Sequence, residues 1–441
     1  MARDLTRIGE RARKDPKARF TSIYHFVMDL DLLRDCFRQM GKGKAPGVDG
    51  VTKEEYGRDL EGNLRRLLQR LAQMSYRPQP VLRRYIPKPG RKKMRPLGLP
   101  CFEDKLVQKA LSRVLEQIYE ADFLGLSYGY RPKRTQHQAL ARLGRTIQQR
   151  KVSWVAEADV RSFFDRLDQE WLMKFLSVRI GDRRVLRLIA RILRSGVMED
   201  GLELASDRGT PQGGSLSALL SNVYLHYALD LWFEKRFRAS CQGEAHLFRF
   251  ADDFVGCFQY QADAQAYLRE LEGRLAKFSL EVEPSKTKLV SFGRFAPERA
   301  RRSGRKPETF DFLGFTHYCG ETRHGRFKVK RRTSRKKFRA KLGECKAWLR
   351  INRSRVKGGA LLRRAKLMLD GHLQYYAVTD NGPMCNNYRH QFGKLLFKWM
   401  NRRSQRRSYT WEQFNQALAW VGWPSVRIRH NICPFAGVGP E

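Results

Sequence analysis

The sequence lacks the features that identify membrane, secreted and zinc-binding proteins. No apolar run reaches the roughly 18 residues that a membrane span requires. The first residues, Met-Ala-Arg-Asp-Leu-Thr-Arg, contain no apolar segment typical of a signal peptide. The eight cysteines form no Cys-x-x-Cys pair, and the nine histidines show no metal-ligand spacing. We therefore expect a protein of the cytoplasm, without a zinc ribbon, a disulfide framework or a membrane partner.

Acidic residues are scarce relative to basic ones. The 441 residues include 87 lysines and arginines against 45 acids, which gives a formal net charge of +42. This excess is larger than solubility requires and predicts a polyanionic partner, because a basic surface attracts phosphate backbones and releases their counterions. An anionic membrane surface is the alternative, but no apolar span accompanies the charge. We expect a nucleic-acid-binding protein, associated with the nucleoid, of two to four domains.

Two adjacent carboxylates stand out in residues 247–258, which read Leu-Phe-Arg-Phe-Ala-Asp-Asp-Phe-Val-Gly-Cys-Phe. Asp252 and Asp253 separate two apolar, aromatic-rich runs, a pattern that predicts a β-hairpin with both acids at its tip. Burying unpaired carboxylates is costly, and a divalent cation such as Mg2+ is the usual neutralising partner. An exposed turn is the alternative, since aspartate is common in turns.

Basic and glycine-rich loops recur in the first half of the chain. Residues 41–50, Gly-Lys-Gly-Lys-Ala-Pro-Gly-Val-Asp-Gly, predict a loop whose backbone either approaches phosphates or serves as a connector. Residues 81–100 predict two short strands joined by a basic tip, either a solvated loop or a hairpin that closes over a triphosphate. Residues 209–215, Gly-Thr-Pro-Gln-Gly-Gly-Ser, predict the entry to a long helix over 216–237, either a plain entry or an edge that holds a base pair.

Hydrophobic periodicity predicts alternating helices and strands through the middle of the chain. One strand ends at Asp159, where an aspartate is more often a cap or turn residue than a metal ligand, and Phe163 and Phe164 follow it. Further predicted helices cover 52–74, 103–119, 136–150 and 262–278, and further predicted strands cover 280–292 and 310–316. Strands that carry aspartates and alternate with helices in this way favour an α+β fold over a parallel doubly wound sheet.

Basic residues are densest in residues 326–441, which hold 27 lysines and arginines against five acids. Helices predicted over 334–351, 359–376 and 386–403 each carry an apolar stripe, which indicates a small bundle with basic faces along which a duplex could lie. The tail interleaves arginines with Tyr409, Trp411 and Trp420. Such a mixture can grip a backbone and stack bases, although most of these aromatic rings are expected in the core.

In chain order, these stretches resemble the reverse transcriptases encoded by bacterial group II introns, in the form that lacks an endonuclease domain. The resemblance begins with an N-terminal extension block at residues 41–50, a fingers hairpin at 86–100 and a second block at 127–134. It continues with a first palm motif at 158–165, a Pro-Gln-Gly motif at 209–215 and an aromatic-x-Asp-Asp motif at 250–253. A primer-gripping block at 310–315 and a maturase region at 398–411 complete it. Phe250 stands where the family more often has tyrosine, a change that should leave metal binding intact.

The resemblance implies an α+β right-hand polymerase with fingers, palm, an α-helical thumb and a short basic C-terminal segment. The implied domains are an N-terminal extension with the start of the fingers over 1–80 and a fingers and palm domain over 81–325. The thumb would cover 326–380, and a maturase or DNA-binding segment would cover 381–441. Asp159, Asp252 and Asp253 match the catalytic carboxylates that bind two Mg2+ ions roughly 3.5–4 Å apart, for attack of a primer 3′-hydroxyl on an α-phosphate.

Other residues are expected to contact the substrates. The resemblance implies nucleotide contacts from five of them, namely Lys88, Arg95, Phe164, Gln212 and Lys286. Phe164 matches the steric gate against a ribose 2′-hydroxyl, with an ordinary core aromatic as the alternative, and Lys286 would lie near the pyrophosphate. Nucleic-acid contacts are expected from the basic residues Lys42, Lys44, Arg131, Arg331, Arg332, Arg335, Arg402, Arg403, Arg406 and Arg407.

The implied function is an RNA-directed DNA polymerase that also binds intron RNA and assists splicing and retrohoming. Its partners would be RNA template, intron RNA, DNA primer or target, and deoxynucleoside triphosphates. The sequence carries no cluster of cysteine and histidine that an endonuclease domain needs, so a mobile form should prime on nicked or single-stranded DNA. Two alternatives are a splicing-only maturase with an idle polymerase site and a detached reverse transcriptase used in DNA repair or phage defence.

Overall fold

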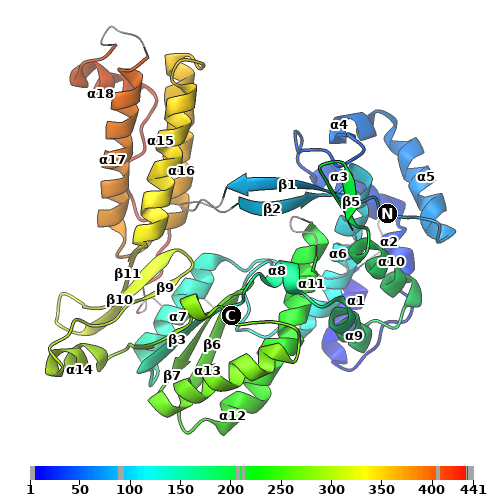
Figure 1. The fold of residues 1–441 in the computed structure, drawn as a ribbon, viewed down its shortest axis with the longest axis horizontal. Coiled ribbons are helices and arrows are strands. Elements are labelled where there is room, and N and C mark those ends of the chain that lie inside the picture. Colours follow the sequence, from blue (N-terminus) through cyan, green and yellow to red (C-terminus); the bar gives the residue numbers. More distant parts are fainter. Residues whose placement is uncertain are drawn as a thin grey trace.

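The computed structural model describes residues 5–87, 94–204, 209–210, 214–403, 408–433 and 435. The described part of the chain is a mixture of helices and strands arranged around three small sheets, with a helical bundle near its C-terminal end (Figure 1). Among the described residues, no helix combines the length and the apolar character needed to cross a bilayer.

A four-stranded antiparallel sheet occupies the centre of the molecule, with strand order β6-β7-β3-β8. Its strands are β3 (Trp154–Asp159), β6 (Ala245–Phe250), β7 (Asp253–Phe258) and β8 (Lys288–Ser291). The hairpin predicted around Asp252 and the strand predicted to end at Asp159 are confirmed. The strand predicted over 280–292 is shorter than expected, because Pro284 begins a 3-10 turn, η4 (Pro284–Lys286), and proline removes a backbone donor that a strand would use.

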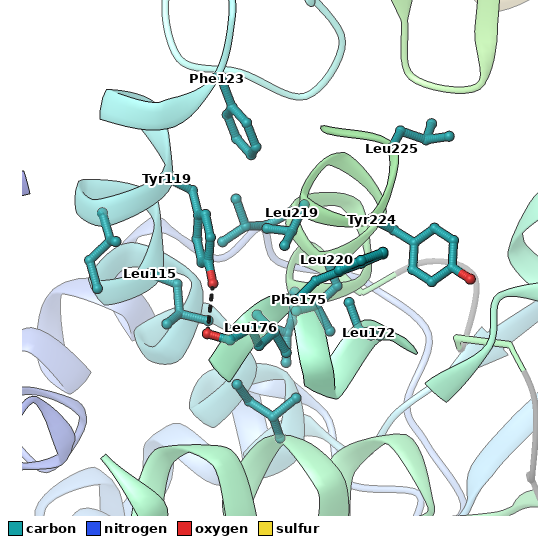
Figure 2. Close-up of a cluster of buried hydrophobic side chains, with 14 of the residues drawn as sticks. Leu115, Tyr119, Phe123, Leu172, Phe175, Leu176, Leu219, Leu220, Tyr224 and Leu225 are labelled. Carbon is teal, nitrogen blue, oxygen red and sulfur yellow. Dashed lines mark hydrogen bonds between the residues drawn. The ribbon is translucent and has the colours of Figure 1, made fainter. Parts of the chain in front are cut away.

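Helices pack beside this sheet, and most of them build the largest core. They are α6 (Phe102–Asp122), α7 (Gln136–Gln149), α8 (Phe163–Arg166), α9 (Gln169–Arg179), α10 (Arg183–Leu193), α11 (Ser215–Leu225) and α13 (Gln261–Ala276). The exception is α7, whose buried side chains belong to a separate core. Figure 2 shows part of the largest core, where side chains from α6, α9 and α11 interdigitate. The Tyr119 hydroxyl there donates to the main-chain oxygen of Leu176 at 3.3 Å, so its one polar atom is satisfied.

The long helix predicted over 216–237 forms, but it is irregular. After α11 the chain passes through two π-helical turns, η2 (His226–Asp230) and η3 (Phe233–Phe237), and ends in the short α12 (Arg238–Ser240). A π turn closes hydrogen bonds between residues five apart and inserts extra backbone into the helix, which changes the direction of the side chains that follow. Hydrophobic periodicity alone does not reveal such a turn.

A second sheet forms an arm that projects from the N-terminal helices toward the bundle (Figure 1). Its strand order is β2-β1-β4-β5, with the hairpin β1 (Val81–Pro87) and β2 (Met94–Leu99) as predicted. The short strands β4 (Val197–Glu199) and β5 (Leu202–Leu204) extend it. The N-terminal helices are α1 (Thr6–Lys14), α2 (Tyr24–Val27), α3 (Leu30–Gln39), α4 (Lys53–Tyr56), η1 (Gly57–Asp59) and α5 (Leu60–Ala72).

The C-terminal part combines a three-stranded sheet with a helical bundle. The sheet has the order β11-β10-β9, with β9 (Phe310–Phe312), β10 (Phe315–Glu321) and β11 (Phe327–Thr333), and α14 (Ala296–Arg302) precedes it. The bundle contains α15 (Arg335–Asn352), α16 (Gly358–Tyr376), α17 (Gly382–Met400) and α18 (Trp411–Trp420), so the three predicted helices are confirmed. Its core continues through Phe414 and Val421, well past residue 380.

Candidate active site

The central sheet brings the three predicted carboxylates to one edge. Asp159, the last residue of β3, lies directly opposite Asp253, the first residue of β7, in the antiparallel register. Phe250 pairs with Asp253 as well, so Ala251 and Asp252 alone form the turn between β6 and β7. Residues opposite each other in adjacent strands lie about 5 Å apart. Two strands and one tight turn therefore gather three acids that are up to 94 residues apart in the chain, from 159 to 253.

Burial and nearby negative charge raise the pKa of Asp252 and Asp253. Burial of its carboxylate raises the pKa of Asp253 to about 7, with further contributions from the negative charges of Asp252 and Asp159. Burial likewise raises the pKa of Asp252, and the charge of Asp159 adds to the effect. The Asp253 residue as a whole is exposed at the strand end, yet protein atoms surround its carboxyl group closely enough to limit hydration. The site therefore favours cationic partners.

Lys286 is the cation that contacts these acids most directly. Its ammonium group forms an ion pair and hydrogen bond with Asp159 Oδ2. The resemblance predicted Lys286 near a pyrophosphate, whereas in this structure its direct partner is a predicted metal ligand. Lys288, two residues further along, instead pairs with Glu157 at 3.2 Å. Lys286 thus provides a local counter-ion for Asp159.

The residue types at this edge suit Mg2+, which prefers carboxylate oxygen ligands. Within the described ranges, however, no group of three or more histidine, cysteine, aspartate or glutamate side chains is arranged as a metal-binding cluster. Lys286 pairs with one carboxylate oxygen of Asp159, Oδ2. The donor chemistry of the three carboxylates fits the ion.

Residues from other elements also act on the carboxylates. The positive charge of Arg95, on β2, offsets part of the rise in the pKa of Asp252, and that of Lys337, on α15, offsets part of the rise in the pKa of Asp253. Tyr130 adopts a left-handed backbone with φ 57°, and burial of its phenol together with the charge of Asp252 raises its pKa. The sequence prediction did not single out Tyr130 or Lys337. The Tyr-Gly-Tyr motif of the second block was the available signal for Tyr130.

The two adjacent phenylalanines after β3 have different environments. Phe163 is 2% exposed and packs in the main core, while Phe164 is only partly buried. Their rings meet edge to face, with centroids 5.4 Å apart. The main-chain oxygen of Phe164 accepts a hydrogen bond from Thr210 N at 2.9 Å, which ties this turn to the loop of the Pro-Gln-Gly motif. Phe163 is therefore the core aromatic, and Phe164 remains the predicted gate.

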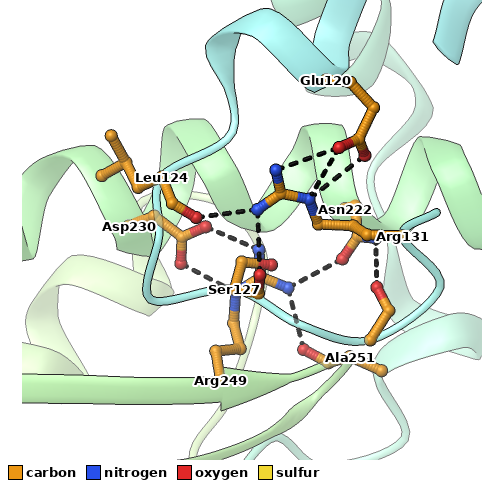
Figure 3. Close-up of polar contacts among 9 residues, drawn as sticks. Glu120, Leu124, Ser127, Arg131, Asn222, Asp230, Arg249 and Ala251 are labelled. Carbon is orange, nitrogen blue, oxygen red and sulfur yellow. Dashed lines mark hydrogen bonds and ion pairs between the residues drawn. The ribbon is translucent and has the colours of Figure 1, made fainter. Parts of the chain in front are cut away.

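Two of the arginines predicted to contact nucleic acid, Arg131 and Arg331, have guanidinium groups that are buried and bonded inside the protein. Arg131 donates to the main-chain oxygens of Leu124 and Ser127 and pairs with Glu120 at 3.0 Å (Figure 3). Arg331 is fully buried in β11 and donates to the oxygens of Leu140 and Ile432. Both arginines hold segments of the fold together.

The other predicted basic contacts have varied surroundings. Lys42, Lys44, Arg332, Arg335 and Arg402 are exposed. Arg403 is partly buried and donates to the main-chain oxygen of Val356 at 2.9 Å, which attaches it to the loop between α15 and α16. Four predicted contacts lie outside the described residues, namely Lys88, Gln212, Arg406 and Arg407.

Comparison with known proteins places these features in context. The family described as reverse transcriptase (RNA-dependent DNA polymerase) matches residues 86–317, a range that contains all three carboxylates. The group II intron-encoded protein LtrA of Lactococcus lactis subsp. cremoris is 35% identical over 222 residues, which is 50% of this chain and 37% of LtrA. Protein YkfC of Escherichia coli (strain K12) is 33% identical over 315 residues, which is 63% of this chain and 81% of YkfC.

Similarity over shorter segments reaches eukaryotic proteins. Nuclear intron maturase 1, mitochondrial, of Arabidopsis thaliana is 34% identical over 97 residues, which is 22% of this chain and 13% of that protein. The chain thus spans little more than a third of LtrA and a small part of the plant maturase. The names of these relatives confirm the resemblance to group II intron proteins that the sequence motifs predict.

Proposed function

Because the chain belongs to the reverse transcriptase (RNA-dependent DNA polymerase) family, we propose that it copies RNA into DNA for a group II intron whose RNA it also binds. The observation that carries the proposal is the register of the central sheet, in which Asp159 faces Asp253 and Asp252 occupies the adjoining turn. Three carboxylates gathered in this way suit transfer of a nucleotide to a primer 3′-hydroxyl.

Asp159, Asp252 and Asp253 would hold divalent cations. Bound Mg2+ ions would lower the pKa of the primer hydroxyl and stabilise the charge of the leaving pyrophosphate. The carboxylates must be ionised for this role, and the neighbouring cations Arg95, Lys286 and Lys337 favour that form through their charge. Lys286 would move from Asp159 to a phosphate oxygen when substrate arrives, since an ammonium group binds either anion.

The parts of the molecule correspond to a right-hand polymerase in this proposal. The arm sheet with β1 and β2 would form the fingers, the central sheet the palm, and the C-terminal bundle the thumb. Arg95, on the arm, and Phe164, beside the central sheet, would then lie on opposite sides of an incoming nucleotide. The boundaries expected from the sequence at 80, 325 and 380 are part of the same proposal.

The intron role is supported by charge and by the names of the relatives. Residues 326–441 carry 27 basic residues against five acids, and exposed arginines such as Arg332 and Arg335 lie where the three-stranded sheet meets the bundle. Such a surface can bind structured RNA through its phosphates. LtrA is described as a group II intron-encoded protein, and the plant relative as an intron maturase.

Sequencing the RNA that copurifies with the tagged protein from its native host tests the intron role. The proposal predicts strong enrichment of one structured intron whose own interior encodes this protein. Diverse cellular RNA, or no enriched RNA, would contradict the splicing and retrohoming role and would favour a reverse transcriptase detached from any intron. Primer extension on an RNA template tests the polymerase activity separately.

A further inference from the structure

The turn that carries Asp252 has a backbone conformation that its sequence does not favour. Ala251 and Asp252 are the two residues between the paired positions Phe250 and Asp253. Ala251 has φ 57°, in the left-handed region where a Cβ atom is strained and where glycine or asparagine is usual. Alanine has no polar side chain that could stabilise the turn locally. Neighbouring groups must therefore hold it.

Arg249, near the end of β6, holds the turn through hydrogen bonds of its guanidinium group (Figure 3). Its Nη1 donates to the main-chain oxygen of Ala251 at 3.0 Å and to Asn222 Oδ1 at 2.9 Å. Its Nε and Nη2 donate to the two carboxylate oxygens of Asp230 at 2.7 Å and 2.5 Å. Arg249, Asn222 and Asp230 are all fully buried. The guanidinium group thus connects the turn to the helix that begins with α11.

The opposite side of the turn is held by the segment around Gly129. Asn222 Nδ2 donates to the main-chain oxygen of Gly129 at 2.7 Å. A Cβ atom on Gly129 would lie 2.3 Å from the nitrogen of Ala251, so its backbone packs directly against the turn. Tyr128 N also donates to the oxygen of Arg249 at 2.9 Å. Asn222 therefore bonds to both groups that hold the turn, the guanidinium group of Arg249 and the backbone of Gly129.

The π turn η2 explains how Asn222 and Asp230 reach the same guanidinium group. In a regular α-helix, a residue eight positions further on points about 80° away from the first. A π turn rotates less per residue because its hydrogen bonds span five residues, and η2 covers the five residues up to Asp230. This smaller rotation returns Asp230 to the face of the helix that Asn222 occupies.

Stability alone does not account for this arrangement. A buried ion pair is weak evidence of stabilisation, because desolvation offsets the attraction and apolar side chains of similar volume often serve as well. Apolar side chains could fill the space of Arg249 and Asp230, but they could not donate to the oxygen of Ala251. The specific consequence of the pair is the position of that oxygen, and hence of the acids that follow it.

We propose that Arg249, oriented by Asp230 and Asn222, is a positioning residue that fixes the Ala251 turn and thereby sets the carboxylates of Asp252 and Asp253 relative to Asp159. The inference rests on the proposed function, which assigns those carboxylates to metal binding. Arg249 and its two partners are buried, and their effect reaches the acids through the main chain of the turn. Changing one of them should therefore alter metal affinity and turnover more than substrate binding.

The test compares Asp230→Asn with a matched control, Asp122→Asn. Asp122 is also an aspartate paired with a buried arginine, Arg179, at 3.0 Å, but neither residue bonds to the turn. Mn2+ binding is measured by electron paramagnetic resonance on the full chain without nucleic acid or nucleotide. We expect Asp230→Asn to weaken Mn2+ binding about tenfold and to lower kcat by a similar factor, with KM for nucleotide within twofold of wild type. Asp122→Asn should lower the melting temperature and leave Mn2+ affinity unchanged.

Further variants keep the outcome decisive. Asp230→Glu, which restores the charge, should recover part of the lost Mn2+ affinity. Where Asp230→Asn does not fold, Asn222→Ala serves, since it retains the ion pair and removes one bond to Arg249 and one to Gly129. Wild-type Mn2+ affinity in the folded variants would overturn the positioning role, provided that Asp253→Asn does lose Mn2+ binding. Should Asp253→Asn also bind Mn2+ as wild type does, the proposed metal site itself is wrong.

Discussion

Lys286 forms an ion pair with Asp159, the residue that faces Asp253 across the central sheet. One cation thus neutralises part of a group of three acids and occupies an oxygen that a metal ion would use. The ammonium group and a divalent cation should compete for Asp159.

Replacing Lys286 with methionine should strengthen Mn2+ binding to the protein without substrate. The variant removes both the competing ammonium group and its repulsion of the metal ion, so we expect the Mn2+ dissociation constant to fall by about threefold to tenfold. Nucleotide incorporation should nevertheless slow, because a positive charge near the phosphates is lost. Lys288→Met is the control, since Lys288 pairs with Glu157 on the same sheet. Equal Mn2+ affinity in the two variants would contradict the competition.

Metal affinity should depend on pH near neutrality. Burial and the charges of Asp252 and Asp159 raise the pKa of Asp253 to about 7, and a carboxylate must lose its proton to bind a metal ion. Mn2+ binding should therefore weaken by about tenfold between pH 8 and pH 6. In Asp253→Asn, binding should be weak and should change little over this interval. A flat profile in wild type would show that Asp253 is already ionised at pH 6.

The raised pKa of Asp253 also predicts how the free energy of unfolding depends on pH. The folded protein holds a proton on Asp253 that the unfolded chain releases at lower pH, so the free energy of unfolding of the metal-free protein should fall as pH rises from about 4 to about 7. Added Mn2+ should reverse that loss at pH 8, because the ion binds the folded state. Thermal melting at several pH values, with and without Mn2+, measures both effects.

Phe164→Ala should admit ribonucleotides. Phe164 is the less buried of the two rings after β3, and its removal would open space beside the incoming sugar. We expect discrimination between deoxyribonucleotides and ribonucleotides, measured as the ratio of kcat/KM, to fall by about tenfold or more. Phe163→Leu is the control, since it should lower the free energy of unfolding by about 1–2 kcal/mol and leave discrimination unchanged. Unchanged discrimination in Phe164→Ala would refute the gate.

Adjacent arginines in β11 should behave differently on substitution with methionine. Arg332 is exposed, so Arg332→Met should weaken RNA binding and lower the slope of its salt dependence by about one. Arg331 is buried, and Arg331→Met would leave the oxygens of Leu140 and Ile432 without their donor. That variant should lower the free energy of unfolding by about 2 kcal/mol and keep the salt slope of wild type. A lowered slope in Arg331→Met would contradict its structural role.

Sequence patterns predicted the strands that carry or adjoin the three acids, and the resemblance to a known family assigned the acids to the site. The apolar runs on either side of Asp252 and the apolar run that ends at Asp159 predicted three strands, and the observed strands lie at those positions. The pairing of β3 with β7 brings together residues that are distant in the chain. The resemblance to a known family predicted that the three carboxylates act together, whereas periodicity on its own did not predict which strands pair.

Side-chain direction was harder to predict. Along β11 the buried residues are Val329, Arg331 and Thr333, which alternate with residues in contact with solvent. A count of positive charges therefore includes Arg331, although its place in the alternation puts it inside. Gly144, on α7, leaves the space that this guanidinium group fills, since a Cβ atom there would lie 1.7 Å from Arg331 Nη2.

The contacts through which Arg249 holds the Ala251 turn could not be predicted, because they depend on a helix irregularity. Arg249 stands in an apolar strand, and its partner Asp230 lies 19 residues earlier. In a regular helix Asp230 would point about 80° away from Asn222, and the smaller rotation of the π turn η2 reduces that difference. Nothing in the spacing of apolar residues distinguishes a π turn from the α-helix around it.

Primer extension on an RNA template with deoxynucleotides and Mg2+ tests the central claim most directly. Wild-type protein is compared with Asp252→Ala and Asp253→Ala, and circular dichroism verifies that each variant is folded. The account predicts extension by wild type and a loss of about 1,000-fold or more in each variant, because the acids that would hold the cations are removed. Extension at the wild-type rate by either folded variant would contradict the assignment of these carboxylates to catalysis.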